Sequence, residues 1–301
     1  MLSIKKYAAI DIGSNAVRLL IANIIEEKGK DTRFKKSSLV RVPIRLGADV
    51  FLEQHISDHN KERMLDTMKA FKLLMKTHKV VKYKACATSA MREAANGKDI
   101  SELIYKKTNI KIDIIEGEEE AAIIAATDLH QFIDKNKTYL YVDVGGGSTE
   151  FTVIHNGKSI TSKSFKIGTV RLLNDIVKKE TWNELETWIK KHTEAYEKID
   201  VIGSGGNINK IFKISGKPLG KPLTYFYLTS YYNTLQSYSY EERITELDLN
   251  QDRADVIIPA TRIYLSAMKW SGAKDIYVPK IGLSDGIIKS IYYDTVSSNT
   301  Q

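Results

Sequence analysis

The fold is decided by one stretch, Leu140-Tyr141-Val142-Asp143-Val144-Gly145-Gly146-Gly147-Ser148, and by the apolar run Thr149–Ile154 that follows it. An apolar segment carries an aspartate near its end, turns on glycines and continues as a second apolar segment. Glycine adopts turn conformations that other residues resist, so this pattern predicts strand, tight turn and strand. The same design occurs in Tyr7–Asn15 with the run Ala16–Ala22, where Asp11 takes the place of Asp143. Two such copies predict duplicated domains that face each other.

The rest of the chain alternates between strand and helix patterns, which indicates an α/β protein. Further strands are predicted at 83–87, 110–115 and 199–202, and the last feeds a third glycine turn, Gly203–Asn207. Helices are predicted from Asp58, from a loop at Thr88 to near Gly97, from Glu118, around 168–178 and 183–197, through most of 230–270, and from about Leu283. We predict two domains, 1–125 and 126–301, with the boundary in 125–137. The final helix, about 283–297, is a candidate to pack back on the first domain.

The composition sets broad limits on the kind of protein. A chain of 301 residues with 43% hydrophobic content can bury a large core and suits two domains. It has no apolar run of about 18 residues or more, as a membrane helix requires, and its N-terminus lacks the pattern of a signal peptide. With Cys86 as the single cysteine, an intrachain disulfide and a thiolate metal site are excluded. We therefore expect a cytoplasmic protein without a membrane partner.

The formal net charge of +8 favours anionic partners but does not choose among them. Polyphosphate, nucleotides, nucleic acid and anionic lipid would all be attracted to a basic surface. The lysines are scattered along the chain and occur at most in short pairs, which is typical of a solvated surface. Nucleic acid is therefore not an expected partner.

The three glycine turns are candidate phosphate-binding loops. Glycine lets backbone N–H groups approach phosphate oxygens closely, and a helix that follows adds a favourable dipole. A single turn would be weak evidence, but three turns, two of them with aspartates, favour phosphate binding. The candidate residues are Ser14, Asn15, Gly145, Gly146, Gly147, Ser148, Gly205 and Gly206.

Acidic residues near these turns are candidate metal ligands and a candidate base. Asp11 and Asp143 offer hard oxygen ligands to Mg²⁺, which prefers a few carboxylates, waters and substrate phosphates; each aspartate can alternatively cap its own turn. Glu150 alternates to the same face as Ser148 and is a second acidic group near the metal. For the general base we favour Glu120. Complementation of the helix dipole alone would explain the three glutamates 118–120, so this pattern does not single it out.

Cationic residues near the turns can neutralise phosphate. Arg18, Arg45 and Arg92 lie in or beside predicted turns, and a guanidinium makes planar, bidentate phosphate contacts. Lys210 and Lys213 follow the third turn, with Lys217 and Lys221 beyond them at near-helical spacing. These four lysines are either a track for a polyanion or a solvated face.

Taken in order along the chain, these motifs resemble the exopolyphosphatase and guanosine pentaphosphate phosphohydrolase (Ppx/GppA) family of the actin, Hsp70 and sugar-kinase superfold. The matching stretches are Asp11–Asn15 with Arg18, Arg45–Gly47, Ala87–Arg92, Gly117–Ala121, Asp143–Glu150, Gly168–Leu172, Gly203–Gly206 and Gly282–Gly286. The resemblance implies two actin-like (ribonuclease H-like) domains with a cleft between them, and a homodimer. It implies release of terminal phosphate from polyphosphate or guanosine pentaphosphate, with Mg²⁺ or, alternatively, Mn²⁺, and it makes guanosine tetraphosphate a further expected partner.

The resemblance also implies roles for individual residues. It makes Glu120 the base, and it associates Asp11, Asp143 and Glu150 with the magnesium ion. The glycine loops hold phosphate, and Arg92 faces the same cleft.

The chain departs from the family pattern at Ser284, where arginine is usual, and at Asn207, where threonine is common. It also ends where longer relatives continue into a helical, HD-like domain, so short polyphosphate or an alarmone is the expected substrate. Two other functions stay open: a kinase or ATPase of the same superfold, and a sensor that binds polyphosphate or alarmone without turnover. The candidate catalytic carboxylates argue against the sensor.

Overall fold

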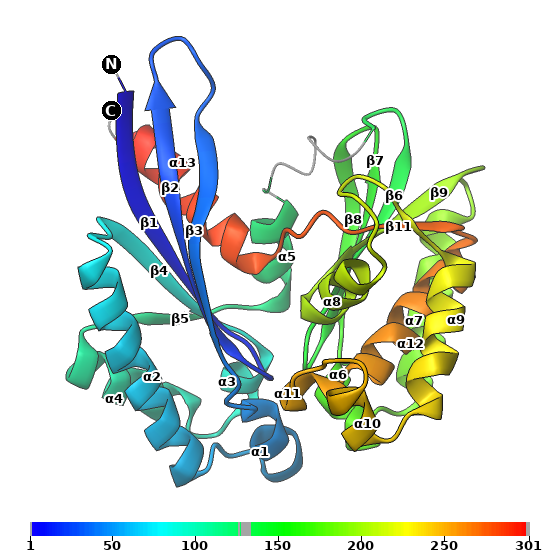
Figure 1. The fold of residues 1–301 in the computed structure, drawn as a ribbon, viewed down its shortest axis with the longest axis horizontal. Helices are drawn as coiled ribbons and strands as arrows, with labels where there is room; N and C mark the ends of the chain where they lie inside the picture. Colours follow the sequence, from blue (N-terminus) through cyan, green and yellow to red (C-terminus); the bar gives the residue numbers. More distant parts are fainter. Residues whose placement is uncertain (1, 126, 128–133, 299–301) are drawn as a thin grey trace. The chain divides into compact units, whose positions relative to one another are not determined.

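The computed structural model describes residues 2–125, 127 and 134–298. The chain divides into two compact units, Met1–Thr127 with Leu283–Gln301 and Asp128–Gly282. Each unit contains a mixed β-sheet with helices packed against it, as Figure 1 shows, so the α/β prediction is confirmed. The predicted boundary lies in 125–137, of which 126 and 128–133 fall outside the described residues.

The sheet of the first unit has the strand order β3-β2-β1-β4-β5. Strands β1, β2 and β3 form an antiparallel meander, and β4 and β5 continue the sheet parallel to β1. The carboxyl ends of β1, β4 and β5 therefore meet at one edge of the sheet. The strands are β1 (Leu2–Ile12), β2 (Val17–Glu27), β3 (Arg33–Val42), β4 (Lys82–Ala87) and β5 (Ile112–Ile114).

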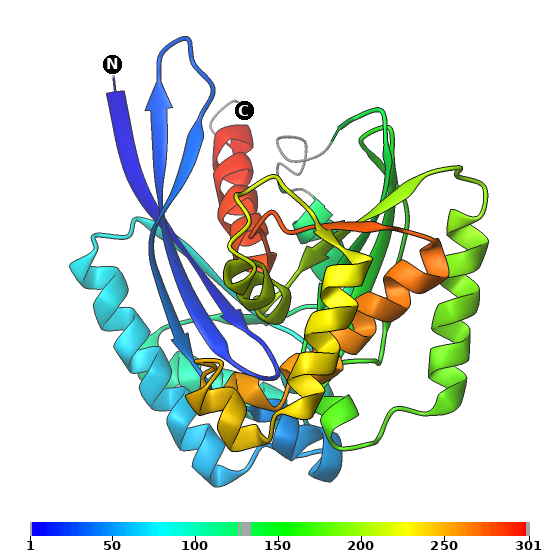
Figure 2. The same cartoon turned by 45° about the vertical axis from the view of Figure 1, so that its right-hand side comes forward.

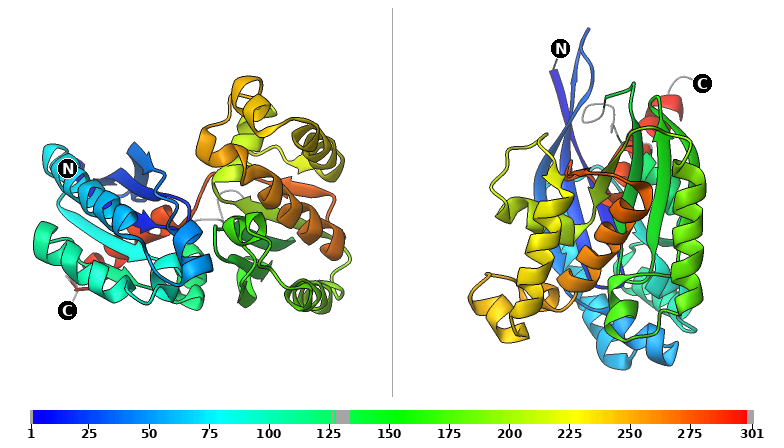
Figure 3. Two further views of the ribbon diagram at one scale, coloured as in Figure 1. Left: turned by 90° about the horizontal axis from the view of Figure 1, so that it is seen from below. Right: turned by 90° about the vertical axis from the view of Figure 1, so that its right-hand side faces the viewer.

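Helices cover both faces of this sheet. Alternate residues of β1 (Ala8, Ile10 and Ile12) join a core with α2 (Asp58–Thr77) and α4 (Gly97–Thr108). On the other face, α13 (Leu283–Ser298) packs against β1, β2 and β4 and against α5 (Gly117–Ala125) (Figure 3). The last helix of the chain is thus part of the first unit.

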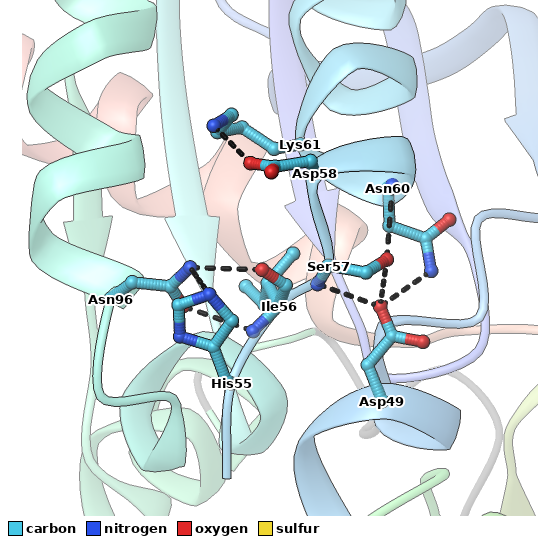
Figure 4. A network of polar contacts seen from close by, with 8 residues as sticks. All are labelled: Asp49, His55, Ile56, Ser57, Asp58, Asn60, Lys61 and Asn96. Carbon is cyan, nitrogen blue, oxygen red and sulfur yellow. Dashed lines mark hydrogen bonds and ion pairs between the residues drawn. The ribbon is translucent and has the colours of Figure 1, made fainter. Parts of the chain in front are cut away.

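A polar network ties α1 (Leu46–Glu53) to the start of α2 (Figure 4). Asp49 Oδ2 accepts hydrogen bonds from Ser57 N (3.0 Å), Ser57 Oγ (2.6 Å) and Asn60 Nδ2 (2.8 Å). Burial acts to raise the pKa of the Asp49 carboxyl, but these hydrogen bonds outweigh burial and lower its pKa below the ordinary value. Asn96 adds two bonds to the backbone of Ile56, at 3.0 and 2.9 Å.

The sheet of the second unit has the order β10-β11-β9-β6-β7-β8. Strands β6, β7 and β8 form an antiparallel meander, β9 and β11 continue parallel to β6, and β10 is antiparallel to β11. The strands are β6 (Thr138–Val144), β7 (Thr149–His155), β8 (Lys158–Phe165), β9 (Ile199–Ser204), β10 (Leu223–Thr224) and β11 (Asp275–Tyr277). The path β8-β7-β6-β9-β11 repeats the path β3-β2-β1-β4-β5, so the predicted duplication is confirmed.

The core of the second unit is built around α12 (Ile257–Ser271), which contacts five other helices of this unit as well as β6 and β9 (Figure 2). Buried side chains of β6, such as Leu140 and Val142, alternate toward this core. The helices are α6 (Thr169–Leu173), α7 (Lys179–Thr193), α8 (Gly206–Ile214), α9 (Tyr225–Ser237), α10 (Tyr240–Thr245), α11 (Gln251–Ala254) and α12 (Ile257–Ser271).

Two helix predictions were wrong in extent. The helix after Thr88, α3 (Ser89–Glu93), ends well before Gly97, and Gly97 instead begins α4. A Cβ at Gly97 would lie 2.1 Å from the carbonyl oxygen of Met91, so this glycine permits close contact between neighbouring turns of chain. The helix expected over 168–178 spans only Thr169–Leu173. The helical structure predicted through most of 230–270 is confirmed, and it is divided among four helices. Within the described residues, no helix is long and apolar enough to cross a membrane.

Candidate active site

The first glycine turn is held by two neighbouring segments. Gly13 N donates to Ala16 O (3.2 Å) and closes the turn. Gly47 N donates to Ser14 O (2.8 Å), and the hydroxyls of Ser14 and Ser89 are hydrogen-bonded at 2.9 Å. In addition, Arg45 N donates to Asn15 O (3.0 Å). The turn that contains the candidate phosphate-binding residues Ser14 and Asn15 is therefore held by backbone N–H groups of the neighbouring segment 45–47.

Asp11 and Arg18 form an ion pair beside this turn. They lie opposite each other in the β1–β2 register, and Arg18 Nη1 is 2.9 Å from Asp11 Oδ2. Asp11 is buried, with 4% exposure, and Ser284 Oγ of α13 also approaches Oδ2 at 3.5 Å. The carboxylate predicted as a metal ligand thus already has a cationic partner, and the departure at Ser284 puts a hydroxyl beside it.

Arg92 lies on α3 and binds the segment that leads into α5. Its Nη1 donates to Ile115 O (2.6 Å), and its Nε lies 3.5 Å from a carboxylate oxygen of Glu116. Ser14 lies in the turn after β1, Arg92 in α3, which follows β4, and Glu120 in α5, which follows β5. The parallel strands therefore bring the segments that carry these three predicted residues to one edge of the sheet.

Burial separates Glu120 from the two glutamates before it. Glu118 and Glu119 are exposed at the start of α5, whereas Glu120 is partly buried and one of its carboxylate oxygens is fully buried. A base that orients a water in a substrate site needs such a half-enclosed position. The structure thus distinguishes Glu120 where the sequence pattern did not.

The second glycine turn has the same closure as the first, because Gly145 N donates to Ser148 O (3.0 Å). In the β6–β7 register, Asp143 lies opposite Glu150. The carboxylate of Glu150 is buried and accepts hydrogen bonds from Ser148 Oγ (2.7 Å) and Ser164 Oγ (2.9 Å). Two predicted metal ligands are therefore neighbours next to a candidate phosphate loop.

The third glycine turn follows β9, the parallel neighbour of β6, so it lies at the same sheet edge as the second turn. Gly205 has φ +113°, and a Cβ there would lie 2.9 Å from Val144 O and 3.5 Å from Asp143 Oδ1. The hydroxyl of Tyr264 donates to Ser204 O beneath this turn. Burial raises the pKa of Tyr264 well above its ordinary value, and the charge of Asp143 raises it further. Only glycine allows the two turns to approach this closely.

The start of α8 completes this edge. The first intrahelical hydrogen bond of α8 runs from Asn209 N to Gly205 O (3.3 Å). The N–H groups of the helical residues before Asn209, which begin at Gly206, therefore have no intrahelical acceptor and point toward the turn. Arg253 Nη1 donates to Gly206 O (2.7 Å) and anchors this first turn of the helix. A helix start with such N–H groups and a positive dipole end suits an anion.

The four lysines after the third turn do not form a helical track, because α8 ends at Ile214. Lys210 and Lys213 are helical, but Lys210 Nζ donates to Asp248 O (2.7 Å). Lys217 lies in the following loop, and its Nζ donates to Pro222 O (2.7 Å). Lys210 and Lys217 thus bind backbone carbonyls of their own unit.

The pair of carboxylates in the second unit fits Mg²⁺ better than a metal ion that requires three or more protein ligands. Among residues 2–125, 127 and 134–298, no group of three or more His, Cys, Asp or Glu side chains is placed to hold a metal ion. Asp143 and Glu150 are two neighbouring carboxylates beside a candidate phosphate-binding loop. Mg²⁺ is commonly held by one or two carboxylates, with waters and substrate phosphates as the other ligands.

Three residues that touch the glycine turns were not predicted as site residues: Arg171, Arg253 and Tyr264. Arg171 belongs to the stretch Gly168–Leu172, which carried part of the family resemblance, so a signal for it existed. Arg253 and Tyr264 lie in the helical region after 230 and reach the turns only through tertiary folding. No local pattern could have marked them.

The sequence of the chain matches one protein family and several known proteins. The model of the Ppx/GppA phosphatase family matches residues 25–294. A Fusobacterium nucleatum protein named bifunctional 3-dehydroquinate synthase/phosphatase is 33% identical over 217 residues, covering 66% of this chain and 32% of that protein. A Photobacterium profundum protein named guanosine-5'-triphosphate,3'-diphosphate pyrophosphatase is 30% identical over 167 residues, covering 56% of this chain and 32% of that protein. The chain thus matches about a third of the length of each of these two relatives.

The fold also matches a solved structure. The crystal structure of an exopolyphosphatase from Cytophaga hutchinsonii matches with a TM-score of 0.81 at 21% identity, covering 96% of this chain and 98% of that chain. This likeness shows a two-unit, actin-like α/β fold.

Proposed function

Because the chain belongs to the Ppx/GppA phosphatase family, we propose that it releases the terminal phosphate of short inorganic polyphosphate or of guanosine pentaphosphate. One observation carries the proposal: two glycine turns lie side by side at the ends of β6 and β9, next to the carboxylates of Asp143 and Glu150. Backbone N–H groups suit phosphate oxygens, and paired carboxylates suit the cation that accompanies a polyphosphate. The name of the Photobacterium profundum relative, guanosine-5'-triphosphate,3'-diphosphate pyrophosphatase, supports guanosine pentaphosphate as a substrate.

The proposal assigns the chemistry to specific residues. The glycine turns Gly145–Ser148 and Gly203–Gly206 bind phosphate oxygens. Glu120 accepts a proton from water as the water oxygen forms a bond to the terminal phosphorus. The bridging P–O bond breaks, and the shortened phosphate chain leaves with the electron pair.

Charge neutralisation is the second requirement, because a phosphoanhydride carries several negative oxygens. Arg92 offsets charge from the first unit. Asp143 and Glu150 would hold Mg²⁺ together with substrate oxygens, and the bound ion would supply Lewis-acid stabilisation of the charge on the transferred phosphoryl group. Asp11, which is paired with Arg18, serves the site by orienting that guanidinium.

A substrate panel tests the proposal. Phosphate release is measured with tripolyphosphate, long polyphosphate, guanosine pentaphosphate and ATP, each with Mg²⁺ and with EDTA. We expect release from tripolyphosphate or guanosine pentaphosphate with Mg²⁺ and its loss in EDTA. Binding of these compounds without any phosphate release would instead identify a sensor, and release from ATP alone would identify an ATPase.

A further inference from the structure

The second glycine turn is held from one side by the segment Gly168–Arg171. Three successive carbonyl oxygens of the turn accept hydrogen bonds from three successive residues of that segment. The pairs are Thr169 N to Gly145 O (3.0 Å), Val170 N to Gly146 O (2.9 Å) and Arg171 Nε to Gly147 O (2.7 Å). The last of the three donors is a side chain, so it is the one that a substitution can remove.

These hydrogen bonds to the carbonyl groups also determine the direction of the N–H groups in the turn. In a trans peptide, the C=O of one residue and the N–H of the next point in opposite directions. The N–H groups of Gly146, Gly147 and Ser148 therefore point away from the segment Gly168–Arg171. In the part of the chain that the structure describes, none of these three N–H groups donates to a protein acceptor. Three convergent N–H groups are the arrangement that binds a phosphate oxygen.

The contact between segment and turn is direct, backbone against backbone. Gly168 has an extended conformation (φ −140°, ψ 164°) that any residue can adopt. A Cβ at this position would nevertheless lie 2.3 Å from Gly146 O. Glycine is needed at 168 for the close approach to the turn, and an alanine there would push the turn away.

We propose that Arg171 is a positioning residue, which holds the Gly147 carbonyl so that the Ser148 N–H faces a phosphate group of the substrate. This inference rests on the proposed function for its substrate. In this role the guanidinium of Arg171 binds the protein's own backbone and does not contact phosphate directly. Loss of one hydrogen bond from a charged donor corresponds to about a tenfold change in an equilibrium constant.

Amide hydrogen exchange of the ligand-free protein gives the first test, which does not depend on activity. In Arg171→Gln, the Gly145 amide, which closes the turn through its hydrogen bond to Ser148 O, is expected to exchange about tenfold faster than in the wild type. Gly168→Ala, which keeps Arg171 but crowds Gly146 O, is expected to have the same effect. Arg262→Gln is the control, because Arg262 packs over the ring of Trp182. Unchanged exchange in Arg171→Gln would overturn the proposal.

Steady-state kinetics with tripolyphosphate at several salt concentrations give the second test. Arg171→Gln and Arg171→Lys are both expected to raise KM about tenfold, with kcat nearly unchanged. The slope of log KM against log salt is expected to stay at the wild-type value, because the number of cationic contacts to the substrate is unchanged. A shallower slope in Arg171→Gln, with recovery in Arg171→Lys, would show direct contact with phosphate and overturn the positioning role. If the wild type released no phosphate, the proposed function would fail, while the exchange experiment would still decide the role of Arg171.

Discussion

Asp143 lies directly opposite Glu150 in the register of the β6–β7 hairpin. In the duplicated hairpin of the first unit, the same register puts Asp11 opposite Arg18, and both turns close with the same backbone hydrogen bond. The duplication has therefore kept the aspartate and the turn but changed the residue seven positions later. In one unit an arginine faces the aspartate, and in the other a second carboxylate does. This difference favours the second unit as the place where a divalent cation binds.

Glu150→Gln should weaken metal binding more than it disturbs the hairpin. The amide keeps an oxygen that can accept from Ser148 and Ser164 but loses the negative charge that attracts Mg²⁺. We expect the Mg²⁺ concentration for half-maximal phosphate release to rise about tenfold or more, by analogy with other losses of a charged contact. The matched control is Glu184→Gln, because Glu184 pairs with Lys163 on the surface. An unchanged Mg²⁺ requirement would remove Glu150 from the metal site.

Glu120→Gln should lower kcat and leave substrate binding largely intact. The amide keeps the size of the side chain but cannot accept a proton, and general-base catalysis contributes typically about 10²- to 10⁴-fold. Phosphate release from the best substrate of the panel measures the effect. Glu118→Gln is the comparison, since Glu118 lies exposed in the same helical turn. If both variants kept wild-type kcat, Glu120 would not be the base.

Gly286→Ala should destabilise the first unit by crowding α13 against α5. A Cβ at Gly286 would lie 2.3 Å from the carbonyl oxygen of Ile123, so one of the two helices must shift. Overpacking of this kind costs typically about 1–3 kcal/mol. Urea unfolding measures the loss, with Ser290→Ala on the same helix as the control. A free energy of unfolding equal to that of the wild type would show that the two helices can separate without cost.

Asp49→Asn should destabilise the protein at neutral pH but not in acid. Hydrogen bonds lower the pKa of Asp49 in the folded state below its unfolded value of about 3.9. The charged form therefore contributes stability above about pH 4, and this contribution disappears as the pH falls through the folded-state pKa. We expect the variant to lose about 1–3 kcal/mol at pH 7 and the difference to shrink below pH 4.

Denaturant unfolding of the Asp49→Asn variant at pH 7 and at several acidic values checks this prediction. Asp66→Asn is the matched control on α2, because Asp66 makes an exposed pair with Lys69 and should change stability by less than about 1 kcal/mol. A loss at Asp49 that stayed constant down to the lowest pH would assign the network a packing role without a charge contribution.

The sequence by itself determined the α/β class, the duplication and most strands. Alternation and glycine turns are local signals, so β1–β2 and β6–β7 could be read from Asp11–Gly13 and Asp143–Gly147 alone. The motif order also indicated the family. The ends of helices were harder to predict. No local pattern shows that Gly97 begins a helix, because glycine is required there by its close approach to the carbonyl oxygen of Met91.

Only the tertiary structure decided which residues support the turns and how the acidic residues differ. Glu118, Glu119 and Glu120 are chemically equal in sequence, and burial distinguishes them only once α5 is packed. Arg171, Arg253 and Tyr264 reach glycine turns from distant segments, and their hydrogen bonds depend on the parallel neighbours β6 and β9. Local patterns follow from backbone geometry within a few residues, whereas burial and long-range hydrogen bonds exist only after the chain has brought separate segments together.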